Sequence, residues 1–506
     1  MKLKVQPLDI KVGKFKVVLN TSDAKELGII AGDRVRLRGI KSITAIVDTT
    51  DDMVSAGMVG IYHEAQGALG LQWTEPVDVM PAKRPSSIEF IKKMMRKEKL
   101  TKDEIYNIVR DVVDESLSDI ELSAFIVASE INSLTDDEVE WLTRAMIDTG
   151  ERIEFDTHPI MDKHSIGGVP GNKISLLVVP IVAAAGLMIP KTSSRAITGA
   201  GGTADLMEML SPVNFSASEI KEITEKTNGA LVWGGGTNIA PADDKLIRIE
   251  YPLSADPHCQ LLASIMAKKG AVGADNVVID IPTGTGTKVP TLVEGRKLAR
   301  DLISLGERLG MNVECAMTYG SSPIGRTVGP ALEVNEALKV LETTKGPNSL
   351  IEKSVSLAGI LLEMGGVSAR GRGHDDALKY LRSGKAHAKM MEIIEAQGGD
   401  PTVKSGDILP AENKIELKAV TSGYIIELDN KRLVEIARML GAPNDKHAGI
   451  KIHKKKGELV KVDETILTLY AEKDWKLTQA IESAQRETPI IVEGMLLERM
   501  PKFREV

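Results

Sequence analysis

The residues best suited to chemistry lie in the stretch KTSSRAITGAGGTADLMEML, from Lys191 to Leu210. Two serines, an arginine, small or threonine residues and a Gly-Gly-Thr come before what reads as the first turn of an amphipathic helix. Glycine lets the backbone approach a ligand closely, and hydroxyls and free amides at a helix start bind anions. A simple loop-to-helix turn needs only one glycine and one cap, so the surplus favours an oxyanion site over that structural alternative.

A second candidate loop, DKHSIGGVPGNKIS, runs from Asp162 to Ser175 and precedes an apolar segment. Lys163 can neutralise a phosphate, Ser165 and Ser175 can donate hydrogen bonds to it, and the paired glycines let backbone amides come close. The alternative is a well-capped helix start with His164 as an ordinary polar side chain. The residues alone leave both interpretations open.

The third candidate loop, PTGTGTKVP, lies at residues 282–290, after the apolar segment VVIDI. None of the three loops is a P-loop, because GxxxxGK[ST] does not occur, and none continues into the GxGxxG of dinucleotide-binding folds. HExxH and clustered Cys/His ligands are missing as well. We therefore expect neither an ATPase nor a nicotinamide enzyme, and no catalytic metal.

Composition narrows the class of protein further. The chain has 506 residues, of which 42% are hydrophobic, enough for about three globular domains. A net charge of -7 gives no bulk attraction to nucleic acid, so we expect no nucleic-acid partner. Cys259 and Cys315 form neither a CxxC pair nor a disulfide framework, which is typical of a reducing compartment. We expect a cytoplasmic protein.

No export signal or membrane segment is expected. The N-terminal MKLKVQPLDIKVGKF alternates charged and apolar residues as an edge strand would, and it lacks the apolar core of a leader. The longest apolar run, from Ile174 to Pro190, is too short for a full span and contains Pro180. It predicts a buried helix.

The elements that must position these loops fall into four regions. Residues 1–84 read as short strands (FKVVLN, DRVRLRG, ITAIVDTT) and predict a β-rich barrel. Residues 85–157 predict a helical domain, to which a segment near 240–270 returns. Three helix starts there fit a capping box: Thr101 with Glu104, Ser118 with Glu121, and Thr135 with Glu138.

Strands, glycine loops and helices alternate over residues 158–408, which predicts an α/β domain with a parallel-rich sheet. Ligands bind such sheets beyond the carboxyl ends of the strands, where the glycine loops fall. Residues 409–506 predict an α+β domain, with strands around the single helix NKRLVEIARMLGA and a solvated turn at HKKKG. The expected fold class is thus multidomain α/β and α+β, with an N-terminal barrel.

The first two loops and the apolar run between them together resemble the thymidine and pyrimidine-nucleoside phosphorylase family. Its signature is Ser-x-Arg followed by Gly-Gly-Thr-x-Asp-x-x-Glu. SADPHCQLLASIMAKK resembles the helix on the base side of that family's site, and the likeness runs from the linker after the barrel into the C-terminal domain. The signature positions in this chain are Ser193, Arg195, Gly201, Gly202, Thr203, Asp205 and Glu208.

Within that family the likeness is closest to the archaeal branch that acts on nucleoside 5′-monophosphates, which carries a similar N-terminal extension resembling a double-psi β-barrel. The resemblance implies that AMP, and also CMP and UMP, reacts with inorganic phosphate to give free base and ribose 1,5-bisphosphate. It implies phosphate as a co-substrate, no further cofactor and a homo-oligomer, a dimer or larger. It places the protein in nucleotide catabolism.

The resemblance also assigns roles to residues. Asp256 would protonate the leaving base, with a helix cap as its structural alternative, and His164 and Lys268 would be possible base contacts. The structural alternative for Lys268 is a solvated helix end, because Lys269 stands beside it. The phosphate nucleophile would be held by Lys163, Ser165, Ser175, Ser193 and Thr203. The nucleotide would be bound by Gly168, Ser194, Arg195, Ala196, Ile197, Thr198, Gly199, Thr203, Ser264 and Lys288.

Two positions bear on specificity. Lys288 stands where the nucleoside enzymes have a non-basic residue, which suits recognition of a 5′-phosphate. Ile249 stands in register with the base-contacting arginine of the pyrimidine enzymes, which argues against a pyrimidine-only pocket.

Three alternative functions remain open. One is a thymidine or pyrimidine-nucleoside phosphorylase. Another is a phosphoribosyltransferase of the anthranilate type, which holds a diphosphate with magnesium and has an acid in its Gly-Thr-Gly-Gly-Asp loop, where GAGGTADLME has threonine. The third is a non-catalytic nucleotide sensor that uses the barrel to bind a partner.

Overall fold

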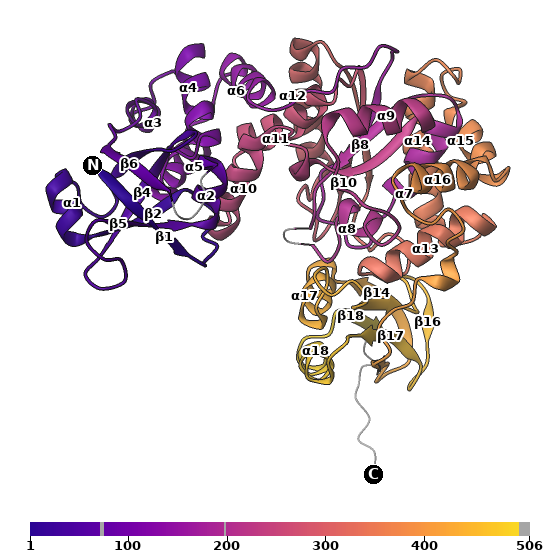
Figure 1. Cartoon of the computed structure of the whole chain (residues 1–506). Coiled ribbons are helices and arrows are strands. Elements are labelled where there is room, and N and C mark those ends of the chain that lie inside the picture. Colours follow the sequence, from indigo (N-terminus) through magenta and orange to yellow (C-terminus); the bar gives the residue numbers. More distant parts are fainter. Residues whose placement is uncertain (71–74, 197–198, 495–506) are drawn as a thin grey trace. The chain divides into compact units, whose positions relative to one another are not determined.

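The computed structural model describes residues 1–70, 75–196 and 199–494. The chain divides into two compact units (Figure 1). Unit 1 comprises Met1–Gly150 and Ala240–Ala267, and unit 2 comprises Glu151–Ile239 and Lys268–Val506. Among the described residues, no helix is both long enough and apolar enough to cross a membrane.

Unit 1 begins with the expected β-barrel, closed in the order β1-β5-β2-β4-β3-β6. The expected edge strand at the N-terminus is wrong, because β1 pairs with β5 on one side and β6 on the other, and a closed barrel has no edge. Leu3 and Val5 point into the apolar core. The elements are β1 (Lys2–Leu8), β2 (Lys16–Asn20), α1 (Thr21–Leu27), β3 (Arg34–Arg38), β4 (Ser42–Thr50), β5 (Met58–Tyr62), α2 (His63–Leu69) and β6 (Pro76–Pro81).

The rest of unit 1 is a helical bundle. The capping boxes predicted at Thr101, Ser118 and Thr135 are all present and start three of its helices. The returning segment supplies α10, which packs on α4, α5 and α6. The helices are α3 (Ser87–Met95), α4 (Lys102–Val113), α5 (Asp119–Ile131), α6 (Asp136–Asp148), α10 (Pro241–Leu253) and the first part of α11 (His258–Ala271).

Unit 2 contains a parallel sheet that sets the positions of the candidate loops. Strands β11, β10 and β7 pair in parallel, as do β8 and β9, and a parallel bridge between Ile160 and Met188 connects the two groups. The three loops leave the carboxyl ends of β7, β8 and β10, as expected for a ligand site in such a sheet. The strands are β7 (Met161–Ser165), β8 (Ile189–Ser193), β9 (Gly229–Trp233), β10 (Asn276–Thr283) and β11 (Asn312–Tyr319).

Helices cover this sheet, and the apolar run from Ile174 to Pro190 lies at the centre of their core. Only its first part is helical: the run forms α7 and then enters β8, so the single helix expected there is too long. The helices are α7 (Ser175–Ala184), α8 (Thr203–Met207), α9 (Ala217–Thr227), α12 (Leu292–Leu309), α13 (Pro330–Thr343), α14 (Asn348–Met364), α15 (Gly373–Arg382) and α16 (Lys385–Ala396).

The C-terminal α+β region is also part of unit 2, and its first sheet includes β12 from the α/β region. It contains two helices where one was expected, and α17 and α18 pack against each other and against β17 (Figure 1). The elements are β12 (Thr327–Val328), β13 (Lys414–Lys418), β14 (Gly423–Leu428), α17 (Asn430–Leu440), β15 (Gly449–Ile452), β16 (Leu459–Val460), β17 (Thr465–Tyr470), α18 (Asp474–Arg486) and β18 (Ile490–Glu493).

The turn HKKKG is only partly solvated. Lys455 points inward and its ammonium donates to the backbone carbonyls of Pro323 and Gly325. Burial lowers the pKa of Lys455 to about 8. This lysine therefore attaches the C-terminal region to the loop that follows β11.

Candidate functional site

The three glycine-rich loops border one cavity of about 710 Å³ in unit 2. Its lining contains more lysine and arginine than acidic residues, although the chain as a whole is acidic. This local excess of positive charge suits an anionic ligand. The expected site residues that line it are Lys163, His164, Ser165, Gly168, Ser175, Ser193, Ser194, Arg195, Ala196, Gly199, Thr203, Lys268 and Lys288.

Four expected site residues are not among those lining residues. Ile197 and Thr198 lie outside the described residues. Asp256 and Ser264 belong to unit 1, where Asp256 is exposed just before α11 and Ser264 is half-buried on that helix.

Strand β7 carries a buried acid that organises the lysines around the cavity. The Asp162 side chain is fully buried, and its carboxylate lies 2.6 Å from the Lys269 ammonium and 3.7 Å from the Lys191 ammonium. The solvated helix end that was the structural alternative for Lys268 does not extend to Lys269, because Lys269 is 1% exposed. Sequence reasoning gave no role to Lys191, although a lysine inside the apolar LMIPKT was a signal that it has a buried partner.

Lys163 is the predicted cation of the nucleophile site, and its ammonium is buried 3.4 Å from Ser175 Oγ. Burial lowers the pKa of Lys163 to about 7, with opposing contributions from the nearby Asp280 and Lys353. Burial and the surrounding lysines also hold the pKa of the His164 ring well below its ordinary value. A bound anion would return charge to Lys163, so this lysine can serve as an anion-dependent cation.

The serine hydroxyls at the cavity already donate to protein acceptors. Ser165 Oγ donates to Asp280 at 2.7 Å, and Ser193 Oγ donates to the Val232 carbonyl at 3.0 Å. Each hydroxyl must rotate to donate to an anion. Asp280 is itself buried and paired with Lys353 at 2.9 Å. Sequence reasoning missed this pair, although an aspartate inside the apolar VVIDI pointed to one.

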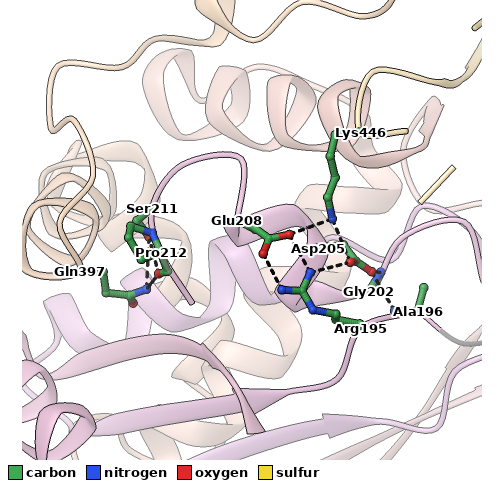
Figure 2. A network of polar contacts seen from close by, with 9 residues as sticks. All are labelled: Arg195, Ala196, Gly202, Asp205, Glu208, Ser211, Pro212, Gln397 and Lys446. Carbon is green, nitrogen blue, oxygen red and sulfur yellow. Dashed lines mark hydrogen bonds and ion pairs between the residues drawn. The ribbon is translucent and has the colours of Figure 1, made fainter. Parts of the chain in front are cut away.

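Two carboxylates, Asp205 and Glu208, bind residues of the loop after β8, as Figure 2 shows. Asp205 Oδ2 accepts hydrogen bonds from the backbone amides of Ala196 and Gly202, at 2.8 and 3.0 Å. The guanidinium of Arg195 pairs with Glu208 and stacks on the Trp233 ring. The pairing with Arg195 lowers the pKa of Glu208 to about 2.

Glycine is required at two close backbone approaches, one within the loop after β8 and one between two loops. A Cβ on Gly202 would lie 2.6 Å from the carbonyl oxygen of Ser194. A Cβ on Gly168 would lie 2.9 Å from the backbone nitrogen of Lys288, and Gly168 has a φ of +82°. Gly168 and Lys288, both of which the resemblance assigned to nucleotide binding, are therefore neighbours across the second and third loops.

The cavity also contains an acid that sequence reasoning did not assign. Glu333 on α13 is buried at the cavity wall, and its carboxylate accepts a hydrogen bond from the Gly329 amide at 3.0 Å. Burial raises the pKa of Glu333 to about 7. In the part of the chain that the structure describes, no cluster of three or more His, Cys, Asp or Glu side chains is arranged to hold a metal ion.

Comparison with known proteins identifies related domains along the chain. Residues 88–150 match the helical bundle domain of a glycosyl transferase family, residues 157–387 match the α/β domain of such a family, and residues 424–491 match the pyrimidine nucleoside phosphorylase C-terminal domain. A solved anthranilate phosphoribosyltransferase from Thermus thermophilus is similar with a TM-score of 0.51 at 18% identity, over 61% of this chain and 98% of that one. That likeness shows a shared fold.

Curated relatives match over the whole length. The AMP phosphorylase of Methanococcoides burtonii is 65% identical over 506 residues, 100% of both chains. The AMP phosphorylase of Methanosarcina mazei is 68% identical over 501 residues, 99% of both chains. AMP phosphorylase 1 of Archaeoglobus fulgidus is 55% identical over 499 residues, 98% of this chain and 99% of the relative.

Proposed function

The chain belongs to the AMP phosphorylase family, and we propose that it cleaves nucleoside 5′-monophosphates with inorganic phosphate at the cavity bordered by its three loops. The substrates are AMP and also CMP and UMP, and the products are the free base and ribose 1,5-bisphosphate. One observation carries the assignment to this cavity. Residues expected to bind the nucleophile and residues expected to bind the nucleotide line the same positively charged space.

The nucleophile site combines a cation with hydroxyls. Lys163 supplies the charge, and its ammonium lies beside Ser175 at the start of α7. Ser165, Ser193 and Thr203 supply further hydrogen bonds to the phosphate. Holding the phosphate in one orientation lowers the barrier, because it removes much of the entropy cost of a bimolecular displacement.

A second anion site holds the 5′-phosphate of the nucleotide. Lys288 is exposed on the cavity wall and Gly168 packs against its backbone. Ser194 and Gly199 line the same cavity. Two anions can share the cavity because several lysines surround it.

Departure of the base requires a proton, and we assign its donation to Asp256. Bond cleavage develops positive charge on the ribose and negative charge on the base. The phosphate stabilises the positive charge on the ribose, and the acid neutralises the charge on the base by protonating it. Ser264, Lys268 and His164 contact the base. The reaction uses no metal or organic cofactor, and the enzyme is a cytoplasmic homo-oligomer.

A panel of nucleosides and nucleotides, assayed for base release with and without phosphate, tests this function. We expect base release from AMP only when phosphate is present, and faster release from AMP than from adenosine. Equal release without phosphate would identify a hydrolase, and no release from any compound would favour the sensor. Loss of activity with a chelator would instead favour the phosphoribosyltransferase.

A further inference from the structure

Behind the loop that follows β8 lies a network of four charged side chains. Arg195 and Lys446 are the cations, and Asp205 and Glu208 are the carboxylates (Figure 2). Of these, Arg195 lines the cavity, whereas Lys446 belongs to the loop between α17 and β15 of the C-terminal region. The network therefore connects the C-terminal region to the wall of the candidate site.

Asp205 is the central member of this network. Its carboxylate is 4% exposed and joins the backbone amides of Ala196 and Gly202, both of which line the cavity. The Lys446 ammonium lies 3.0 Å from Asp205 Oδ1 and 3.0 Å from Glu208 Oε2. Figure 2 shows Lys446 reaching both carboxylates from the side opposite to Arg195. The C-terminal region thus supplies the second cation of the network, in addition to Arg195 of the loop itself.

Hydrogen bonds fix the backbone at Lys446, and this holds its ammonium near one position. The Lys446 carbonyl accepts a hydrogen bond from the Ala331 amide at 2.9 Å, in the first turn of α13. The next carbonyl, of His447, accepts one from Ala411 at 2.9 Å. The Lys446 side chain is 24% exposed, so it can be replaced without opening the core.

We propose that Lys446 is a positioning residue that sets the affinity of the site for phosphate without touching it. With Lys446, the network carries two positive and two negative charges. Without Lys446, one carboxylate charge is left uncompensated next to a loop that has to bind an anion. Asp205 also loses one of the two cations that hold its carboxylate in place. Both changes weaken phosphate binding, because like charges repel through a poorly screened interior. This inference rests on the proposed function.

The test compares K446M, which keeps the aliphatic stem, with K446R, which keeps the charge. We expect K446M to raise the KM for phosphate roughly tenfold with little change in kcat, since an uncompensated unit charge acting on an anion through a weakly screening medium changes its affinity by about that factor. K446R restores most of the affinity. The control is K456M, an exposed lysine of the HKKKG turn, which leaves both constants unchanged.

Charge compensation gives a second comparison. In E208Q/K446M, Arg195 and Asp205 again balance, so the double variant binds phosphate more tightly than K446M alone. If melting shows that K446M does not fold, E208Q/K446M is compared with E208Q. We then expect the double variant to have the higher KM for phosphate, because E208Q alone leaves one positive charge uncompensated, and equal values would overturn the proposal. Unchanged phosphate KM in K446M, or a double variant weaker than both single variants, overturns the proposal. Wild-type protein that releases no base with phosphate refutes the proposed function instead.

Discussion

At the scale of single residues, the cavity combines titrating groups that a sequence cannot reveal. The sequence shows only that residue 163 is a lysine, whereas burial in the structure lowers its pKa to about 7. Its neighbours Asp162 and Asp280 are both fully buried, and each is paired with a lysine distant in sequence. The charge of the site therefore depends on pH near neutrality.

Anion binding should weaken as pH rises through about 7. Lys163 is protonated below its pKa and loses its charge above it, so the inhibition constant of sulfate, which stays dianionic, should increase up to about tenfold between pH 7 and 8. Glu333 ionises over the same range and adds to the effect. Competition assays with sulfate from pH 6 to 8.5 measure this slope.

The control for that experiment is K163M. It removes the part of the slope that belongs to Lys163 and leaves the part that belongs to Glu333. A wild-type inhibition constant that does not change with pH would show that Lys163 does not titrate in this range.

Replacement of Asp256 by asparagine tests proton donation at a single atom. Asn keeps the size and hydrogen-bonding capacity of the side chain but cannot act as an acid, so kcat should fall by about 10²–10⁴. The melting temperature should stay the same, because Asp256 is exposed. Near-normal turnover would return Asp256 to the structural role of a helix cap.

At the scale of elements, local signals predicted what local interactions determine. The capping boxes at Thr101, Ser118 and Thr135 start helices because both partners lie three residues apart. Helix α18 was missed because its N-cap, Lys473, makes no side-chain cap hydrogen bond. The burial of Lys269 was not predicted, because its partner Asp162 is 107 positions away along the chain. The three loops were found, but their charge network was not.

The close approach of the second loop to the third gives an element-scale prediction. G168A should push Lys288 away, because the added Cβ would lie 2.9 Å from the Lys288 nitrogen. G167A is a matched control: Gly167 also has a positive φ, +90°, but nothing lies within 4 Å of the position that an added Cβ would take there. We expect G168A to reduce kcat/KM for AMP more than for adenosine, and G167A to reduce both by the same modest factor. If G168A reduced kcat/KM equally for AMP and adenosine, Gly168 would have no part in recognition of the 5′-phosphate.

At the scale of the whole molecule, unit 1 joins two regions of different architecture, the barrel and the helical bundle. Arg34 on β3 is central to their contact: it is 4% exposed, donates to the Ser116 carbonyl at 2.7 Å and pairs with Glu121. Glu121 also completes the capping box of α5. The barrel is thus attached to the start of a bundle helix.

Removal of that buried cation should destabilise unit 1. R34M leaves Glu121 without its cation and removes the donor to the Ser116 carbonyl. Since Glu121 is partly exposed, we expect a loss of about 1–3 kcal/mol in the free energy of unfolding. The matched control is K14M, which breaks the pair of Lys14 with Asp119, in the first turn of the same helix. That pair is 30% and 56% exposed and should be worth less than about 1 kcal/mol. Hydrogen exchange read separately in the two units should show faster exchange in unit 1 of R34M and unchanged exchange in unit 2. Equal losses in R34M and K14M would show that burial of Arg34 does not hold the barrel on the bundle.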